Sequence, residues 1–479
     1  MFIKKNAIIV LCVLVMFWSA RPLDACYGVL VGKKASEDGS VIFGHVEQND
    51  GERIINFRKI PRMKFETGTL VKLKNGGTLP QVKETYSFLW SENPGLSFSD
   101  AYFNEWGVAV GSDGCPSREA SYEKLVERGD IVDGGIGYML RRLIAQRSKT
   151  ARSGVELAGR LVEQFGYSDP GRTLIIADPN EAWILALIRG KRWVARRVGD
   201  HEVVLVPNVY VIDEINLADS KNFLGSSDLV EYAKQMGWYN PASGKPFSFR
   251  KAYGPAGQGD CDPRQWRGQC IVLDKDLATN EPLPFAVKPG RKFAVKDVIR
   301  ILRDHGRDGK GQICNTAVQE ASVFQLRSGM PQEIGCIYWR TSGAPCTAAL
   351  VPWYLGISQT PANFYKPVAI ERQLALEHHF NPPKGTFEFD PELSWWTFMT
   401  LQDLVHKDYK NNLLKARRVW DDFEAKEFAK QAEFEENILN KYSSDPDTAR
   451  KLLTEYSHQM AQRTLTLATE LIKELGGKK

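Results

Sequence analysis

Residues 26–46 read CYGVLVGKKASEDGSVIFGHV, and the fold of this chain can be predicted from this stretch. Two runs rich in β-branched and aromatic residues, Tyr27–Val31 and Val41–Val46, flank the tetrapeptide Glu-Asp-Gly-Ser. Strand-forming runs on either side of a glycine-containing turn are typical of a β-hairpin. The sequence therefore predicts an antiparallel hairpin that begins directly after a cysteine, Cys26.

The segment before this hairpin has the features of a targeting sequence. Lys4 and Lys5 form a positively charged start, and an apolar stretch runs from Ala7 to Trp18. This stretch is shorter than the about 20 residues that cross a bilayer, and no later apolar window is long enough. We expect residues 1–25 to be a signal peptide, alone or with a short propeptide. The mature chain should then be periplasmic or extracellular, with no stable membrane span.

Two alternatives for the N-terminus stay open. The segment could remain as an uncleaved anchor. The run Leu23-Asp-Ala-Cys26 also resembles a bacterial lipobox, although Asp24 and the preceding Arg21-Pro22 are unusual there. A lipid-anchored Cys26 would carry a thioether, which is not a nucleophile, so lipidation and thiol chemistry exclude each other.

Downstream, residue periodicity predicts an α+β body followed by a helical region. Predicted strands cover residues 107–112, 173–177, 182–188, 192–197, 322–326, 337–340 and 347–351, and predicted helices cover 137–146, 154–165 and 293–304. From about Leu393, Lys, Glu, Ala and Leu dominate, with Asp447 as a candidate cap of the last helix. We expect the body to span residues 26–390 and the helical region 391–479.

The composition excludes several classes of protein. The chain is 43% hydrophobic and 25% charged, as globular proteins are. Its net charge of +5 comes from 63 basic and 58 acidic residues, a balance that argues against nucleic-acid binding. No H-E-x-x-H, C-x-x-C, Walker loop or G-x-S-x-G occurs. We therefore predict no metal, no nucleotide and no other cofactor.

A cysteine freed at a chain terminus combines a nucleophile with a base. The α-amine has an ordinary pKa of about 7.7–8.0 and the thiol one of about 8.5, so proton transfer between them needs little tuning. Hydrolases with an N-terminal threonine use the same arrangement. Cys26 is the candidate for this role, and a disulfide partner or lipid anchor is the alternative.

The hairpin resembles the mature start of dipeptidases related to the secernins, in the cysteine branch of the N-terminal nucleophile (Ntn) hydrolases. Further stretches resemble family motifs in the same order: residues 98–110, 115–118, 177–183, 193–197, 206–208, 324–326 and 351–354. The resemblance implies an αββα four-layer sandwich with Cys26 on a strand at the edge of a sheet. It also implies amide hydrolysis of dipeptides or other short peptides through an acyl-enzyme.

The resemblance also implies roles for single residues. Asn208, after Val-Pro, matches a position that helps to form an oxyanion hole, with a simple turn residue as the alternative. Arg264 and Arg267 resemble an Arg-x-x-Arg segment that could pair with a substrate carboxylate or polarise the thiolate, with a solvated surface pair as the alternative. Asp113 falls where relatives often carry an amide, and a carboxylate donates only when protonated, so its role stays open.

One departure from the family pattern concerns the residue that holds the α-amine. Relatives carry a basic or polar residue and, three positions later, an acidic one. The matching residues here are His45 and Gln48, and Gln48 has no negative charge. Glu47 and Asp50 are nearby, but a shift of one residue on a strand reverses the face. The sequence therefore leaves open a slow, altered or inactive enzyme.

Six cysteines remain besides Cys12 and Cys26: Cys115, Cys261, Cys270, Cys314, Cys336 and Cys346. An even number in an exported chain permits three disulfides, and Cys261 with Cys270 is the local candidate pair, which would rigidify the Arg264 segment. The alternative is that several are buried free thiols.

Together these observations favour an exported cysteine-type dipeptidase that acts on short peptides. An amidase of the same fold for non-peptide acyl amides is the first alternative. A catalytically inactive binding or cell-surface (lipo)protein is the second. The sequence leaves a homo-oligomer open, as well as the side chains that the substrate pocket prefers.

Overall fold

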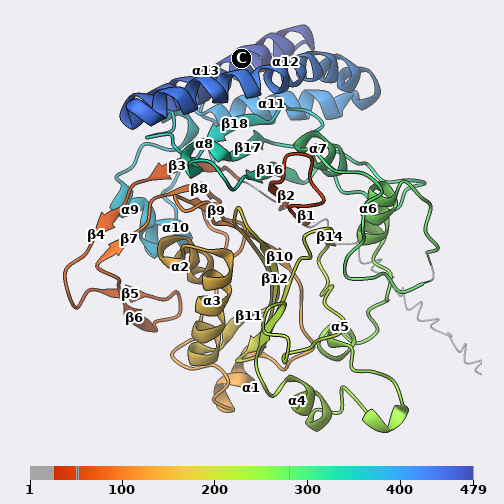
Figure 1. Ribbon diagram of the computed structural model, residues 1–479. Coiled ribbons are helices and arrows are strands. Elements are labelled where there is room, and N and C mark those ends of the chain that lie inside the picture. Colours follow the sequence, from red (N-terminus) through yellow and green to blue (C-terminus); the bar gives the residue numbers. More distant parts are fainter. Residues whose placement is uncertain (1–25, 50, 52, 280, 478–479) are drawn as a thin grey trace, which may run out of the picture.

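The computed structural model describes residues 26–49, 51, 53–279 and 281–477, so the expected targeting segment lies outside the described residues. Two β-sheets stack at its centre (Figure 1). The six-stranded sheet has the order β14 (Val203–Val206), β1 (Tyr27–Val31), β2 (Val41–Gln48), β16 (Val318–Leu326), β17 (Cys336–Ser342), β18 (Val351–Tyr354). The eight-stranded sheet has the order β15 (Phe223–Gly225), β13 (Trp193–Arg197), β12 (Ala182–Gly190), β11 (Tyr167–Ala177), β10 (Ala109–Gly114), β9 (Ala101–Asn104), β8 (Phe88–Glu92), β3 (Asn56–Ile60).

Helices cover the outer face of each sheet. On the eight-stranded sheet lie α2 (Met139–Arg147) and α3 (Ala151–Phe165). On the six-stranded sheet lie α6 (Pro263–Leu273), α7 (Val295–Leu302), α11 (Ser394–Lys407), α12 (Tyr409–Ser444) and α13 (Pro446–Glu474). This layering confirms the predicted αββα fold.

Shorter elements decorate this sandwich. The helices are α1 (Tyr122–Glu127), α4 (Leu229–Gln235), α5 (Phe249–Tyr253), α8 (Gln332–Gly335), α9 (Ile370–Leu374) and α10 (Leu376–Phe380), with 3₁₀ turns at Pro241–Ser243 and Ala362–Phe364. The strands β4 (Met63–Lys64) and β7 (Glu84–Thr85) pair with each other, as do β5 (Leu70–Lys72) and β6 (Thr78–Pro80).

The predicted hairpin forms, but not at the edge of its sheet. β1 pairs with β2 on one side and with β14 on the other. The expectation of an edge strand is therefore wrong, because residues far along the chain return to cover β1. Another correction concerns the strand expected at 347–351. The chain there is a loop in which Leu350 N–H donates to a Glu424 carboxylate oxygen over 3.0 Å, and β18 begins only at Val351.

The C-terminal helices form the outer layer of the sandwich. α11 to α13 lie together beyond β17 and β18 (Figure 1), and their apolar residues belong to the same core as the six-stranded sheet. The last helix is capped by Asp445 and not by Asp447, because Asp445 accepts a hydrogen bond from Thr448 N–H over 3.1 Å. Among the described residues, no helix combines the length and apolar character that crossing a membrane requires.

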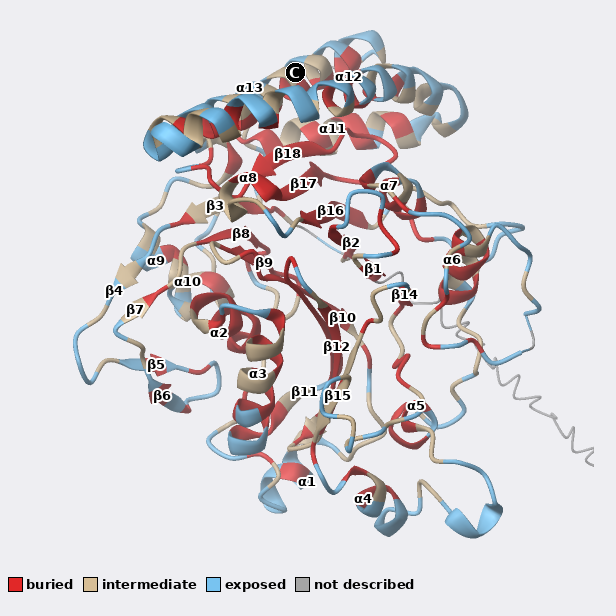
Figure 2. Cartoon of the chain, viewed as in Figure 1, coloured by how far each residue is buried: buried red, intermediate tan, exposed pale blue. Residues whose placement is uncertain are grey.

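The sheets approach each other most closely at glycines. A Cβ on Gly28 of β1 would lie 2.3 Å from Ile175 Cδ1 of β11 and 3.4 Å from Asp113 Oδ2 of β10. A larger residue here would displace the Ile175 side chain, so this glycine helps to bring the residue before β1 to the end of β10. The central strands are buried, and the exposed surface of the C-terminal region lies on the outer sides of α12 and α13 (Figure 2).

Candidate active site

Cys26 lies immediately before β1, where the ends of β2 and β10 come together. Its side chain is 5% exposed. The thiol donates a hydrogen bond to Oε1 of Glu47 over 3.1 Å, and the backbone oxygen of Gln48 lies 3.9 Å from Sγ. The Sγ atom of Cys26, a ring nitrogen of His45 and a carboxylate oxygen of Asp113 lie within 4.8 Å of one another. The fold therefore gathers one thiol, one imidazole and two carboxylates at one point.

The direction of the side chains on β2 explains this grouping. Side chains on a strand alternate between the faces of the sheet, so His45 and Glu47 share a face. That face looks toward the eight-stranded sheet, where His45 Nε2 lies 3.3 Å from Oδ1 of Asp113. Both residues are thus held between the sheets beside Cys26.

Gln48 points to the opposite face. Its side-chain nitrogen donates to the carbonyl of Ile313 over 2.8 Å, and its side-chain oxygen accepts from Asn315 over 3.0 Å. The expectation that the Gln48 side chain takes the place of the acidic group beside Cys26 is therefore wrong. A separation of three residues from His45 reverses the face, whereas a separation of two keeps it, so the carboxylate comes from Glu47.

Asp113 and His45 form a buried pair. Burial lowers the pKa of His45, but the charge of Asp113 and their hydrogen bond outweigh this effect, so the pKa is raised overall. The second oxygen of Asp113, Oδ2, has no hydrogen-bond partner within the described part of the chain. His45 therefore tends to carry a positive charge between Asp113 and Glu47.

In this environment the thiol keeps its proton, and its carboxylate partner loses its proton only near neutral pH. Burial raises the pKa of Cys26 well above its ordinary value, and the negative charges of Glu47 and Asp113 raise it further. Burial also raises the pKa of Glu47 to about 7, against the opposing effects of His45 and of its hydrogen bonds. A positive charge in addition to that of His45 would be needed close to Cys26 to form the thiolate.

Arg264 and Asn208 lie together on the backbone side of Cys26. Arg264, in the first turn of α6, donates to the carbonyl of Cys26 over 3.2 Å and to Oδ1 of Asn208 over 2.7 Å. Tyr27 Oη donates to the Arg264 carbonyl over 3.1 Å and ties α6 to β1. Because Oδ1 of Asn208 faces Arg264, its NH₂ group is turned away toward β10, and a Cβ on Gly114 would lie 3.8 Å from Nδ2.

Arg267 is directed elsewhere. It forms a two-bond ion pair with Asp304, over 2.8 and 2.7 Å. This pair joins α6 to the end of α7, so the structure does not bring Arg267 to Cys26. Of the two arginines considered for the site, Arg264 thus lies at the cysteine and Arg267 lies between helices.

The sequence analysis assigned Glu47 to the wrong face of its strand and did not identify Arg172. Arg172 of β11 is buried, donates to Tyr167 Oη over 3.0 Å, and lies close enough for Cys26 to raise its pKa further. The two-residue spacing from His45 is a signal that could have identified Glu47. Arg172 offers only a weak one, an arginine at the start of an apolar run.

The seven cysteines in the described residues are free thiols. Cys261 and Cys270, the local candidate pair, lie in one small apolar cluster with Trp266. The structure therefore has them unbridged, in line with the alternative of buried thiols.

Comparison with known proteins gives a consistent set of relatives. The model of peptidase family C69 matches residues 25–422. A Streptococcus pyogenes serotype M1 protein called probable dipeptidase B is 24% identical, over 98% of this chain and 97% of that protein. A Bifidobacterium longum dipeptidase is 28% identical, over 71% of this chain and 72% of that protein. Penicillin V acylase from Agrobacterium tumefaciens aligns with a TM-score of 0.38 at 11% identity, over 69% and 86% of the two chains.

Proposed function

The chain belongs to peptidase family C69, and from this premise we propose that it hydrolyses dipeptides and other short peptides with Cys26 as an N-terminal nucleophile. One observation carries the proposal: the buried Cys26 thiol directly precedes β1 and donates to Glu47 over 3.1 Å. The names of the relatives, dipeptidase and probable dipeptidase B, support the substrate class.

The proposed activation begins with cleavage of the bond between Ala25 and Cys26. This cleavage frees an α-amine next to the thiol and the Glu47 carboxylate. In its ammonium form the amine adds a positive charge that opposes the effect of the two carboxylates, so it lowers the pKa of the Cys26 thiol. Glu47 accepts a hydrogen bond from the amine, and His45 stabilises the negative charge of Glu47. Removal of residues 1–25 as an export signal would account for this cleavage.

The proposed reaction proceeds in two halves. The neutral amine takes the thiol proton, and the thiolate attacks the carbonyl carbon of the scissile peptide bond. The resulting ammonium gives its proton to the departing amine, the C–N bond breaks, and a thioester remains on Cys26. A water molecule, deprotonated by the same amine, then attacks the thioester and releases the acid with the thiol restored.

Asn208 and Arg264 complete the proposed site. Arg264 fixes Asn208 through Oδ1, so the Asn208 NH₂ group can donate to the oxyanion of the tetrahedral intermediate. Arg264 also holds the Cys26 carbonyl, which fixes the position of the nucleophile. Both residues thus position the reacting groups and stabilise the developing negative charge, while the covalent bonds form and break at Cys26.

The proposal is tested by the intact mass of the exported protein together with a Cys26→Ala variant. We expect a mature chain that begins at Cys26 and hydrolyses a dipeptide panel, and no hydrolysis after Cys26→Ala. The matched control is Cys336→Ala, which removes a buried thiol from β17 and should leave turnover intact. Dipeptide hydrolysis that survives Cys26→Ala would refute the nucleophile. Turnover restricted to non-peptide acyl amides would instead favour the amidase.

A further inference from the structure

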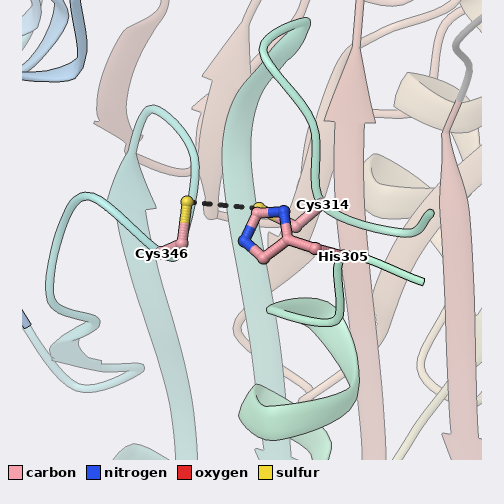
Figure 3. A group of neighbouring side chains, drawn as sticks. All are labelled: His305, Cys314 and Cys346. Atoms are coloured by element: carbon pink, nitrogen blue, oxygen red, sulfur yellow. Dashed lines mark hydrogen bonds between the residues drawn. The ribbon is translucent and has the colours of Figure 1, made fainter. Parts of the chain in front are cut away.

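A second group of cysteines, separate from Cys26, lies at the end of the six-stranded sheet where β16 begins. Three side chains converge there from separate segments: His305 after α7, Cys314 before β16, and Cys346 between β17 and β18 (Figure 3). The two sulfurs are 3.5 Å apart. Both sulfurs and a ring nitrogen of His305 lie within 4.8 Å of one another. Both cysteines are buried, and His305 is partly exposed.

Neighbouring side chains orient this group, here called the His305–Cys314–Cys346 cluster. Tyr409 Oη lies 2.7 Å from His305 Nε2, which leaves Nδ1 of the ring for another partner. His406 of α11 hydrogen-bonds with the Cys346 sulfur, as His305 does. A hydrogen-bond partner on one nitrogen of the ring, which fixes its orientation, is the usual arrangement around a metal-binding histidine.

We propose that the His305–Cys314–Cys346 cluster binds a divalent zinc-type ion. Two sulfurs bound tetrahedrally about 2.3 Å from zinc lie about 3.8 Å apart, whereas bonded sulfurs in a disulfide lie about 2.05 Å apart. The distance of 3.5 Å between Cys314 and Cys346 is close to the zinc value. Two cysteines and a histidine are also a common zinc ligand set, with water or His406 completing the tetrahedron.

The charges around the cluster suit such an ion. Binding releases the two thiol protons, so two thiolates and a neutral imidazole offset the two positive charges of the metal. Arg417 donates to the Cys346 carbonyl over 3.4 Å and is paired with Asp421, and Arg303 is paired with Glu424. The surroundings therefore contribute little net charge, and a neutral complex can be buried without a large desolvation penalty.

The proposed ion would hold together segments that reach the candidate active site. Cys314 lies between Ile313 and Asn315, which are the two residues that bind the Gln48 side chain. Gln48 follows Glu47 on β2, so a metal at Cys314 restrains the strand that presents the carboxylate to Cys26. The expectation from sequence that the chain binds no metal arose because these ligands form no local motif.

The first test measures metal in the full-length protein carrying Cys26→Ala, so that the thiol of the Cys26–His45–Asp113 group cannot contribute. The protein is purified under reducing conditions, incubated with zinc, gel-filtered and analysed by elemental mass spectrometry. We expect one zinc per chain. Cobalt in place of zinc should give the intense near-ultraviolet charge-transfer bands of thiolate ligands.

Variants then locate the ion. Cys314→Ser and Cys346→Ser should each lose the zinc and the cobalt–thiolate bands, while the matched control Cys336→Ala should keep both. Tyr409→Phe removes the hydroxyl on His305 and should weaken zinc binding about 10–100-fold without removing a ligand. The zinc measurement on the Cys26→Ala protein stands even if a serine variant fails to fold.

Three results would overturn the proposal. The first is a zinc-free protein after incubation, and the second is zinc that remains after loss of Cys314 and Cys346. The third is a disulfide that forms between these cysteines when the reduced, zinc-incubated protein is freed of reductant and exposed to air, recognised by a mass lower by two hydrogens.

Discussion

The two faces of the six-stranded sheet use cysteine in opposite ways. On the inner face, Cys26 lies beside the carboxylates of Glu47 and Asp113. On the side of α7 and α11, Cys314 and Cys346 lie beside imidazoles, those of His305 and His406.

The difference shows that neighbouring charge decides what a buried thiol can do. Burial and the neighbouring carboxylates raise the pKa of Cys26, so this thiol remains protonated until a further positive charge arrives. That is a suitable resting state for a nucleophile that processing must switch on. A pair of thiols beside imidazoles instead offers three ligands to one cation.

The largest expected effect tests which face of β2 serves Cys26. Glu47→Gln keeps the size of the side chain but removes the charge that we propose holds the α-amine. We expect kcat/KM for dipeptides to fall about 10²–10⁴-fold, the range typical of a group that assists proton transfer. Steady-state kinetics on the processed enzyme would measure this fall.

Gln48→Ala is the matched variant on the opposite face. It removes the hydrogen bonds to Ile313 and Asn315 and should lower thermal stability while changing kcat much less than Glu47→Gln does. If the two variants had reversed effects, Gln48 and not Glu47 would be the residue that serves Cys26, and the comparison of the faces would fail.

A second prediction concerns Asn208 on the inner face. Asn208→Ala removes the proposed oxyanion donor, and we expect kcat to fall about 10²–10³-fold with little change in KM. The reason is that the donor binds charge that develops only in the transition state. A variant that raised KM and left kcat unchanged would assign Asn208 to substrate binding instead.

A third prediction uses the raised pKa of Cys26. In chain that still carries residues before Cys26, most of the thiol is protonated at pH 8, so alkylation by iodoacetamide should be slow. Processing should accelerate it about tenfold for each unit by which the ammonium lowers the pKa. In unprocessed chain, Glu47→Gln should also accelerate alkylation, because the Glu47 charge raises the thiol pKa. Equal rates before and after processing would contradict the proposed activation.

The smallest expected effect separates the two arginines of α6. Arg267→Ala breaks the ion pair with Asp304, and we expect the free energy of unfolding to fall by about 1–3 kcal/mol with kcat nearly unchanged. Arg264→Ala should instead lower kcat, because Arg264 holds Asn208 and the Cys26 carbonyl. Chemical denaturation and kinetics on both variants would measure these effects. A large loss of kcat in Arg267→Ala would contradict the assignment of Arg267 to stability and Arg264 to the active site.

Much of the fold was predictable, because it rests on local patterns. The hairpin, the helices near residues 139–165 and the strands of β11 to β13 follow from periodicity and turn residues close in sequence. The family also followed from ordered motifs, which the match to peptidase family C69 confirms. The interior position of β1 in its sheet was not predictable, since β14 reaches it from far along the chain.

The sequence by itself determined the hairpin after Cys26, the family, and the candidates Cys26, Asn208 and Arg264. Only the tertiary structure decided that Glu47 and not Gln48 faces the thiol, and that Arg267 binds Asp304. It alone also brought Cys314 to Cys346, which are separated by 32 positions. Helix and strand periodicity can be recognised from a few neighbouring residues. Contacts between side chains far apart in the sequence depend instead on how the sheets and helices pack.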